Sequence, residues 1–338
     1  MKRSKDSPAK MMDCEQRNIE ISQINEENRK FLITTKKNID DLVLSISHLG
    51  VINAPVVLPR HDQYIIVCGF KRIEAARFLG LTHIPARVLP PDTSQQQCAR
   101  FCIADNAFQR PFNLIEISRA FALLQKFFRG SEATLQEASL LGLPSNTDYL
   151  EKVAPLCQMP SFIQKAVLSG LISISTVWQL SQMPEKEAAA FVDIFSALNC
   201  SLNKQREIIT LAKEISIRDD ITVFEVLMEQ SFQKIVHDDS LDSNQKTRQF
   251  RKHLRRLRYP HITEAENNFS TQTKKMGLSE RFRLIAPQDF EGDTYRLTMD
   301  FKNLDEIEAH RKKLDALIAR PEFISIFQTC LPITGGRP

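Results

Sequence analysis

A glycine followed by two cations lies between a strand-like run and a helix-like run in this chain. The glycine is Gly69, the cations are Lys71 and Arg72, and the strand-like run is residues 64–68. Because glycine has no Cβ, its amide can approach a phosphate oxygen closely, and a guanidinium can hold two such oxygens at once. The start of a helix adds unpaired N–H groups that attract anions. The spacing indicates a phosphate site, although taken alone it also fits a capped turn with a solvated basic edge.

Hydrophobic periodicity gives the elements that must position this turn. Residues 39–46 predict an amphipathic helix closed by Gly50, and residues 73–78 predict a second helix ended by Gly80. Three strands are expected around them, at residues 54–58, 64–68 and 84–88. The turn is therefore expected between a strand and a helix of one small α/β domain.

Further along, Asp105 and Asn106 offer a carboxylate and an amide oxygen, and Arg110 follows them. Such oxygens are hard ligands, and Mg²⁺ usually takes one or two of them together with phosphates and water. The alternative is that this pair caps a helix beginning near Phe112 or Asn113. The sequence leaves both interpretations open.

The order of these segments resembles the N-terminal domain of the ParB family of chromosome- and plasmid-partition proteins, a fold shared with sulfiredoxin. The resemblance covers residues 18–120 and rests on Asn28-Arg29 and on the stretches IDDLVLSISHLGVINAPVVL, YIIVCGFKRIEAARFLGLTHIPARV and IADNAFQRPFNLIEISRAFALL. It implies that the chain binds CTP with Mg²⁺, and that the nucleotide closes a homodimer into a clamp around DNA. By position, it implies a nucleotide site of Gly69, Phe70, Lys71, Arg72, Asn106 and Arg110, and a metal site of Asp105 and Asn106.

Two departures from the family pattern bear on catalysis. Phe70 occupies the place of a glutamate, and an aromatic ring neither binds a metal nor polarises a water. The arginine of the second segment also lies one place later, at Arg110. We therefore expect at most a weak CTPase and assign no catalytic residue. The alternative is an enzyme of the same fold, either a metal-dependent nuclease or a nucleotide-dependent phosphotransferase.

The middle of the chain predicts a helical, DNA-docking region. Residues 113–128 show a helical apolar period, and residues 134–140, Gly142 and a second helix over 146–156 are arranged as a helix-turn-helix. The candidate DNA contacts are Ser145, Asn146, Thr147 and Lys152. The first three could equally be N-caps, and the second helix has no arginine that could hold guanine.

A basic helix is predicted over residues 246–258, with Phe250, Leu254 and Leu257 on one apolar stripe. The cations assigned to DNA phosphates are Arg251, Lys252, Arg255 and Arg256. The alternative is a solvated helix whose cations pair with acidic neighbours elsewhere in the fold. We favour DNA because almost no glutamate is interleaved among these cations.

Together these segments predict an α+β protein: a flexible tail (1–17), a ParB/sulfiredoxin-like α/β domain (18–112), an all-α domain with the helix-turn-helix (113–235), the basic helix (236–266) and a small C-terminal α+β domain (267–338). In the last, strands are expected at residues 281–285 and 295–301 and a helix at 304–318. The C-terminal domain could pair two copies of the chain, or pack only within one.

Composition sets the outer limits. The chain has 338 residues, 42% of them hydrophobic and 25% charged, which suits two or three packed domains. Its seven cysteines are scattered and indicate neither a disulfide framework nor a zinc site, and Cys68 precedes Gly69 rather than following it as in sulfiredoxin. No apolar run is long enough for a membrane span. We expect a cytoplasmic, nucleoid-associated protein with no membrane partner, and the resemblance adds a ParA-like ATPase as a partner.

Overall fold

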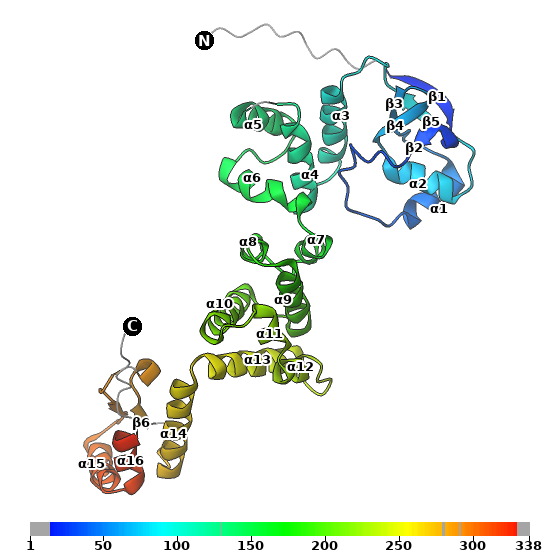
Figure 1. The fold of residues 1–338 in the computed structure, drawn as a ribbon. Helices are drawn as coiled ribbons and strands as arrows, with labels where there is room; N and C mark the ends of the chain where they lie inside the picture. Colours follow the sequence, from blue (N-terminus) through cyan, green and yellow to red (C-terminus); the bar gives the residue numbers. More distant parts are fainter. Residues whose placement is uncertain (1–13, 129, 279–280, 291, 330–338) are drawn as a thin grey trace, which may run out of the picture. The chain divides into compact units, whose positions relative to one another are not determined.

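The computed structural model describes residues 14–128, 130–278, 281–290 and 292–329. The chain divides into two compact units, Met1–Gln182 and Met183–Pro338, which are described one at a time (Figure 1). None of the helices in the described ranges combines the length and the hydropathy that a bilayer-spanning segment needs.

The first unit begins with a mixed five-stranded sheet of order β1-β5-β3-β4-β2. Its strands are β1 (Glu15–Glu20), β2 (Ile24–Asn25), β3 (Val56–Arg60), β4 (Gln63–Cys68) and β5 (His83–Val88). The β1–β5 and β3–β4 pairs are antiparallel, and the β3–β5 and β2–β4 pairs are parallel. The three strands predicted from alternation are the three central ones, so this part of the prediction is confirmed.

Three helices accompany this sheet: α1 (Asp40–Leu49), α2 (Phe70–Phe78) and α3 (Gln95–Ala107). Ile73 and Ala76 of α2 pack into one buried cluster with Val57, Ile66 and Ile84 of the sheet. α1 packs against α2, and α3 packs against β4. The glycine turn therefore lies where β4 ends and α2 begins, beside the helix that carries Asp105 and Asn106.

Residues 15–17, which the sequence placed in a flexible tail, lie in strand β1. Residues 1–13 of that predicted tail lie outside the described residues. β1 lies at the edge of the sheet, and only Ile19 among its residues is buried. Because this strand has no alternating apolar pattern, periodicity could not detect it.

Gly69 has a conformation that other residues adopt at a cost. Its φ is +86°, and a Cβ added there would lie 2.8 Å from Pro55 Cβ and 2.9 Å from Pro55 Cα. Gly80 makes a matched comparison, because its φ is +70° and a Cβ there would meet nothing within 4 Å. The turn that presents the two cations thus depends on glycine for both its backbone conformation and its packing.

We expect Gly69→Ala to lower the free energy of unfolding by about 3 kcal/mol, and Gly80→Ala by about 1 kcal/mol. Both variants place a side chain at positive φ, but only the first also forces a collision with Pro55. Urea unfolding of the two variants beside the parent chain measures the difference. Equal losses for the two variants would contradict the packing argument.

The first unit continues as helices α4 (Leu114–Gln125), α5 (Ser131–Leu140), α6 (Thr147–Val153), α7 (Ser161–Leu168) and α8 (Ile174–Ser181), with a 3₁₀ turn at Ala154–Gln158. The two helices of the predicted helix-turn-helix are α5 and α6, and Gly142 between them has a φ of +77°. α6 ends at Val153 and not at residue 156, because the chain tightens into the 3₁₀ turn.

The second unit opens with helices α9 (Glu185–Leu198), α10 (Leu202–Asp219), α11 (Val223–Met228), α12 (Gln230–Val236) and α13 (Ser243–Arg258). Buried aromatic rings hold them together, and the Phe232 and Phe250 ring centroids lie 4.6 Å apart. The predicted basic helix is α13, with Phe250 and Leu254 fully buried on its apolar stripe. Helices α11 and α12 meet at Glu229.

The rest of the second unit is helix α14 (Pro260–Met276), a two-stranded antiparallel sheet of β6 (Phe282–Ile285) and β7 (Arg296–Met299), a 3₁₀ turn (Gln288–Phe290), α15 (Leu304–Ile318) and α16 (Pro321–Thr329). A second core of Met276, Phe282, Leu317 and Ile326 joins these elements. The polar segment that begins at Asn267 lies inside α14. The predicted mixed α+β class is confirmed, with helices in the majority.

Candidate functional site

One cavity of about 200 Å³ brings together the two segments that the sequence singled out. Its walls come from the start of α2, the end of α3 and the loop of residues 31–36. The predicted site residues that line it are Gly69, Phe70, Lys71, Arg72, Asp105, Asn106 and Arg110. All seven residues assigned to nucleotide or metal therefore face a single space, although residues 72 and 105 are far apart in the chain.

Arg72 brings an uncommitted cation to this cavity. Its guanidinium makes no ion pair and no side-chain hydrogen bond with any residue in the described part of the chain. One Nη atom lies 3.4 Å from the place that a Cβ on Gly69 would occupy, so the guanidinium folds back over the glycine turn. A half-buried guanidinium with unused donors can hold two anion oxygens.

Neighbouring cations in the same cavity act on the ammonium group of Lys71. Its pKa is lowered from the ordinary lysine value, first by burial and then by repulsion from Lys36 and Arg110. Its Nζ donates a hydrogen bond to the backbone carbonyl of Asn38. An anion bound here would relieve the repulsion and raise this pKa again.

Arg110 lines the cavity but is already engaged. Its two Nη atoms each lie 2.7 Å from a carboxylate oxygen of Glu116, and one also lies 3.1 Å from the carbonyl of Pro111. A ligand phosphate would have to share this guanidinium with Glu116. The structure therefore gives Arg110 a role in positioning the cavity wall, and its direct contact with a nucleotide stays a prediction.

Glu116, which we did not single out in the sequence, connects the walls of the cavity. Its side chain has no exposed surface and accepts hydrogen bonds from the backbone N–H groups of Thr35 (2.9 Å) and Asn113 (3.2 Å) as well as from Arg110. Asn113 caps α4 and Glu116 completes the capping box. The spacing Asn-x-x-Glu before an apolar run was the sequence signal that could have revealed it.

The environment of Glu116 also sets its protonation. Burial alone would raise the pKa of this carboxyl, but the hydrogen bonds from Arg110 and from the Thr35 and Asn113 amides outweigh burial and lower the pKa to about 2. The folded-state pKa lies below the ordinary value of 4.5, so the carboxylate stabilises the fold above that pH. This stabilisation is lost as the pH falls from 4.5 toward about 2.

We expect Glu116→Gln to lower the free energy of unfolding by about 3 kcal/mol at pH 7, because it leaves Arg110 without its carboxylate. The difference from the parent chain should shrink as the pH falls toward about 2. Urea unfolding at pH 7 and at low pH measures both effects. Glu15→Gln is the control, because its pair with Arg17 is exposed to solvent and should contribute little to stability. A loss as small as the control's would contradict the connecting role of Glu116.

Asp105 and Asn106 lie in the last turn of α3, and they do not cap the next helix. That alternative from the sequence is wrong, since Asn113 is the cap of α4. Asn106, which lines the cavity, donates from its Nδ2 to the Cys102 carbonyl at 2.7 Å, and this leaves its Oδ1 as an acceptor. Within the described ranges, no group of three or more His, Cys, Asp or Glu side chains could hold a metal ion. The donor set fits Mg²⁺ only where phosphate oxygens and water supply the remaining ligands.

Cys68 is 2% exposed, and burial raises its pKa well above that of an ordinary thiol. A buried, protonated thiol is a poor nucleophile. Cys68 is therefore a buried packing residue of β4.

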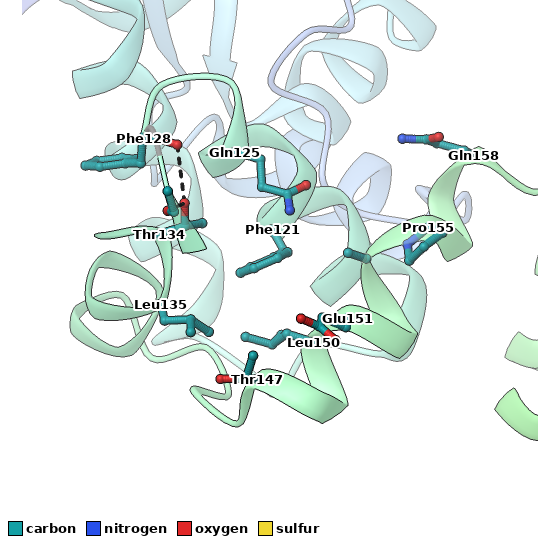
Figure 2. Close-up of a pocket in the computed structure, with 12 residues that line it drawn as sticks. Phe121, Gln125, Phe128, Thr134, Leu135, Thr147, Leu150, Glu151, Pro155 and Gln158 are labelled. Atoms are coloured by element: carbon teal, nitrogen blue, oxygen red, sulfur yellow. Dashed lines mark hydrogen bonds between the residues drawn. The ribbon is translucent and has the colours of Figure 1, made fainter. Parts of the chain in front are cut away.

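A second cavity, of about 510 Å³, lies among α4, α5, α6 and the 3₁₀ turn that follows α6 (Figure 2). Phe121, Leu135 and Leu150 give it an apolar centre, and Gln125 and Glu151 bring polar groups to it. Thr147, one of the predicted DNA contacts, lines its edge.

Of the other predicted contacts of the helix-turn-helix, Ser145 and Asn146 precede the first residue of α6, and Lys152 lies in its last turn. Asn146 is its N-cap, and its side chain accepts a hydrogen bond from the Tyr149 amide at 2.8 Å. Ser145, Thr147 and Lys152 are exposed. Asn146 therefore has the capping role that the sequence gave as its alternative, and DNA contact by the four residues stays a prediction.

The structure separates the cations of α13 into paired and unpaired groups. Arg251 pairs with Glu207 at 2.6 Å, Arg258 with Glu214 at 2.7 Å, and Arg255 with Glu266 at 3.1 Å. Lys246 donates to the backbone carbonyl of Val236 at 2.8 Å. The alternative interpretation of the basic helix, pairing with acidic neighbours, thus holds for Arg251 and Arg255.

Three cations of α13 keep their charges free: Arg248, Lys252 and Arg256. All three are exposed, and among the described residues none has an ion-pair or side-chain hydrogen-bond partner. Their spacing of four residues places them in one row along the helix, about 6 Å apart. We call them the free basic row. Of the residues assigned to DNA from the sequence, only Lys252 and Arg256 belong to it.

Residues 4–107 match the family model of the ParB N-terminal domain. This region is therefore similar to ParB N-terminal domains. The resemblance predicted from the sequence is confirmed, and the cavity at Gly69–Arg72 lies within the ParB part of the chain together with the α3 residues Asp105 and Asn106.

Curated relatives carry the ParB name as well. The chain is 24% identical over 151 residues to the probable chromosome 1-partitioning protein ParB of Deinococcus radiodurans, covering 45% of this chain and 50% of that protein. It is 22% identical to the probable chromosome-partitioning protein ParB of Campylobacter jejuni, covering 46% of this chain and 54% of that protein. The chain thus spans about half the length of these relatives.

Two solved structures illustrate the range of similar chains. The C-terminally truncated chromosome-partitioning protein ParB of Caulobacter crescentus, complexed with CTP-gamma-S, is 22% identical, with coverage of 53% of this chain and 92% of that chain and a TM-score of 0.26. A Pnob8-like ParB-N domain is 13% identical, with coverage of 73% and 99% and a TM-score of 0.36.

Proposed function

We propose that this chain is a ParB-like DNA-binding protein of plasmid or chromosome partition, or of related DNA organisation, and that its ParB N-terminal domain binds a nucleoside triphosphate of the CTP type. The observation that carries the proposal is the convergence of the glycine turn and the end of α3 on one cavity. The unpaired Arg72 and the lowered pKa of Lys71 support an anionic ligand there. The phosphates would lie against Gly69, Lys71 and Arg72.

Mg²⁺ would be held by the Asp105 carboxylate and the Asn106 amide oxygen jointly with the phosphates. Bound there, the ion would neutralise phosphate charge. Phe70 stands beside this site, where the family has a glutamate, and supplies no base. The proposal therefore includes at most weak hydrolysis, and it does not include the nuclease or phosphotransferase.

The nucleotide would act as a switch that closes a homodimer around DNA, as the family resemblance implies. The support within this chain is the attachment of the cavity wall to the helical region. Arg119 of α4 donates to the carbonyls of Ile33 (3.3 Å) and Thr34 (2.9 Å), and Asn113 Nδ2 donates to Thr35 Oγ1 at 2.7 Å. A ligand that moves this loop would therefore pull on α4. A ParA-like ATPase is the further partner that the family implies.

Titration of CTP, ATP and GTP with Mg²⁺ into the purified full chain tests the nucleotide site. Saturable binding of at least one of them is expected. Failure of all three to bind at millimolar concentration would overturn the nucleotide switch and leave an ordinary DNA-associating scaffold. Cleavage of plasmid DNA that disappears in Asp105→Ala would instead favour the enzyme.

A further inference from the structure

A larger cleft, of about 530 Å³, continues from the cavity at Gly69–Arg72 and reaches α7 within the same unit. The two spaces share five lining residues: Leu32, Thr34, Lys36, Phe70 and Lys71. The smaller cavity lies below the roughly 300–1,000 Å³ that encloses a small organic ligand. A nucleotide whose phosphates lie at Arg72 would therefore extend its other end into the larger cleft.

The far wall of this cleft is a face of α7, with Ser161, Gln164, Lys165 and Leu168. This wall carries one cation, Lys165, whereas Lys36 and Lys71 together give the near wall two. A neutral amide beside an apolar side chain suits a nucleobase better than it suits a phosphate, because a base is flat, largely apolar and edged with hydrogen-bonding groups.

Gln164 is held in one orientation. Its Nε2 donates to the carbonyls of Met159 (2.8 Å) and Cys157 (3.2 Å), so both amide protons are used and the side-chain amide cannot turn over without losing them. Its Oε1 has no hydrogen-bond partner in the described ranges. Gln164 is half-buried and thus offers the cleft a fixed acceptor and no donor.

We propose that Gln164 selects the base of the bound nucleotide by accepting a hydrogen bond from an exocyclic amino group, an inference that rests on the proposed nucleotide site. Cytosine and adenine carry their amino group, N4 or N6, where uracil and guanine carry a carbonyl oxygen, O4 or O6, and the amino group of guanine lies elsewhere on its ring. A carbonyl against the fixed Oε1 would leave two acceptors facing each other and unpaired. Gln164 thereby disfavours bases with a carbonyl at this place. Because Gln164 belongs to α7, a helix in the helical part of the unit would contact the base directly.

Binding of CTP, UTP, ATP and GTP to the full chain with Mg²⁺ tests this, with the ratios of dissociation constants as the readout. CTP is expected to bind roughly tenfold more tightly than UTP, and ATP roughly tenfold more tightly than GTP, which is the effect of one hydrogen bond made or opposed. A structural role of Gln164 would weaken all four alike and would leave these ratios unchanged.

Two variants and one control complete the test. Gln164→Met removes the acceptor and should bring both ratios near one. Gln164→Lys keeps a donor for the Met159 and Cys157 carbonyls while it removes the acceptor, so it should abolish or invert the preference even if Gln164→Met folds poorly. Lys165→Gln, at the neighbouring position of the same helix, should change the affinities together and leave the ratios as they are.

The outcomes separate the two proposals. If no triphosphate binds, both the nucleotide site and the role of Gln164 are overturned. If triphosphates bind but CTP equals UTP and ATP equals GTP, or if the ratios persist in both Gln164 variants, only the role of Gln164 is overturned.

Discussion

Arg72→Ala is expected to weaken triphosphate binding at least a hundredfold and to change the free energy of unfolding by less than about 0.5 kcal/mol. The guanidinium has no ion pair or side-chain hydrogen bond among the described residues, so its removal breaks neither kind of interaction within the fold. It should also lessen the positive charge around Lys71, whose pKa is already lowered by burial and by neighbouring cations. We therefore expect the substitution to lower the affinity for triphosphate and to leave the stability of the fold almost unchanged.

The size of the effect follows from the geometry of a guanidinium. Two charge-assisted hydrogen bonds to phosphate, each contributing roughly 1.5–3 kcal/mol, correspond to two or more orders of magnitude in the dissociation constant. Arg72→Lys keeps the charge but loses the two-pronged contact, so it should fall between the parent chain and Arg72→Ala. Calorimetric titration of the three proteins gives the order directly.

Arg17→Ala is the matched control for Arg72→Ala. Arg17 lies in β1 of the same domain, is half-exposed and pairs with Glu15, and it does not line the cavity. Its loss should leave nucleotide binding unchanged. If Arg72→Ala bound triphosphate within threefold of the parent chain, the phosphates would not lie at the glycine turn.

The glycine turn could be predicted from sequence because its causes are local. A strand-like run, a residue suited to positive φ and a helix start are all contained in a short window, and the structure shows β4, Gly69 at a φ of +86° and α2 in that order. The bounds of α15 were also predicted as the structure has them, because this helix has a clear apolar period.

What the sequence could not supply is the set of long-range pairs that give residues their roles. Glu116 accepts a hydrogen bond from Thr35, 81 positions away, and no local sequence pattern predicts that contact. The same holds for Arg251 and Glu207, which are 44 positions apart. A cation can be assigned to DNA or to an internal ion pair only when the element packed against it is known, and here α10 supplies two of the acidic partners of α13.

Neutralising the free basic row, as Arg248→Gln, Lys252→Gln and Arg256→Gln together, is expected to weaken binding to a duplex of arbitrary sequence roughly a hundredfold at about 0.15 M salt. Each phosphate neutralised by a protein cation releases counterions, so the slope of log K against log salt should become shallower by about 2.7. Because these three side chains have no partner in the described part of the chain, thermal unfolding should stay unchanged.

The paired cations of the same helix provide the comparison. Arg251→Gln with Arg255→Gln removes two positive charges from α13, but each is already offset by a carboxylate, Glu207 or Glu266. We expect this variant to change the salt slope by less than about 1 and to lose some stability, because two carboxylates lose their partners. Fluorescence anisotropy at several salt concentrations measures all three proteins under the same conditions.

The comparison decides how α13 meets DNA. If the triple variant keeps the slope of the parent chain, the free basic row does not contact phosphates, and DNA affinity comes from elsewhere in the chain. If the paired variant instead shows the larger change, Arg251 and Arg255 must leave their carboxylates to reach phosphates. In that case Glu207→Gln would strengthen DNA binding by freeing Arg251, whereas under our proposal it leaves DNA affinity almost unchanged. The Glu207→Gln variant thus distinguishes two cases. In one, the basic surface is already free before DNA binds, and in the other, DNA must first break the ion pairs of the helix.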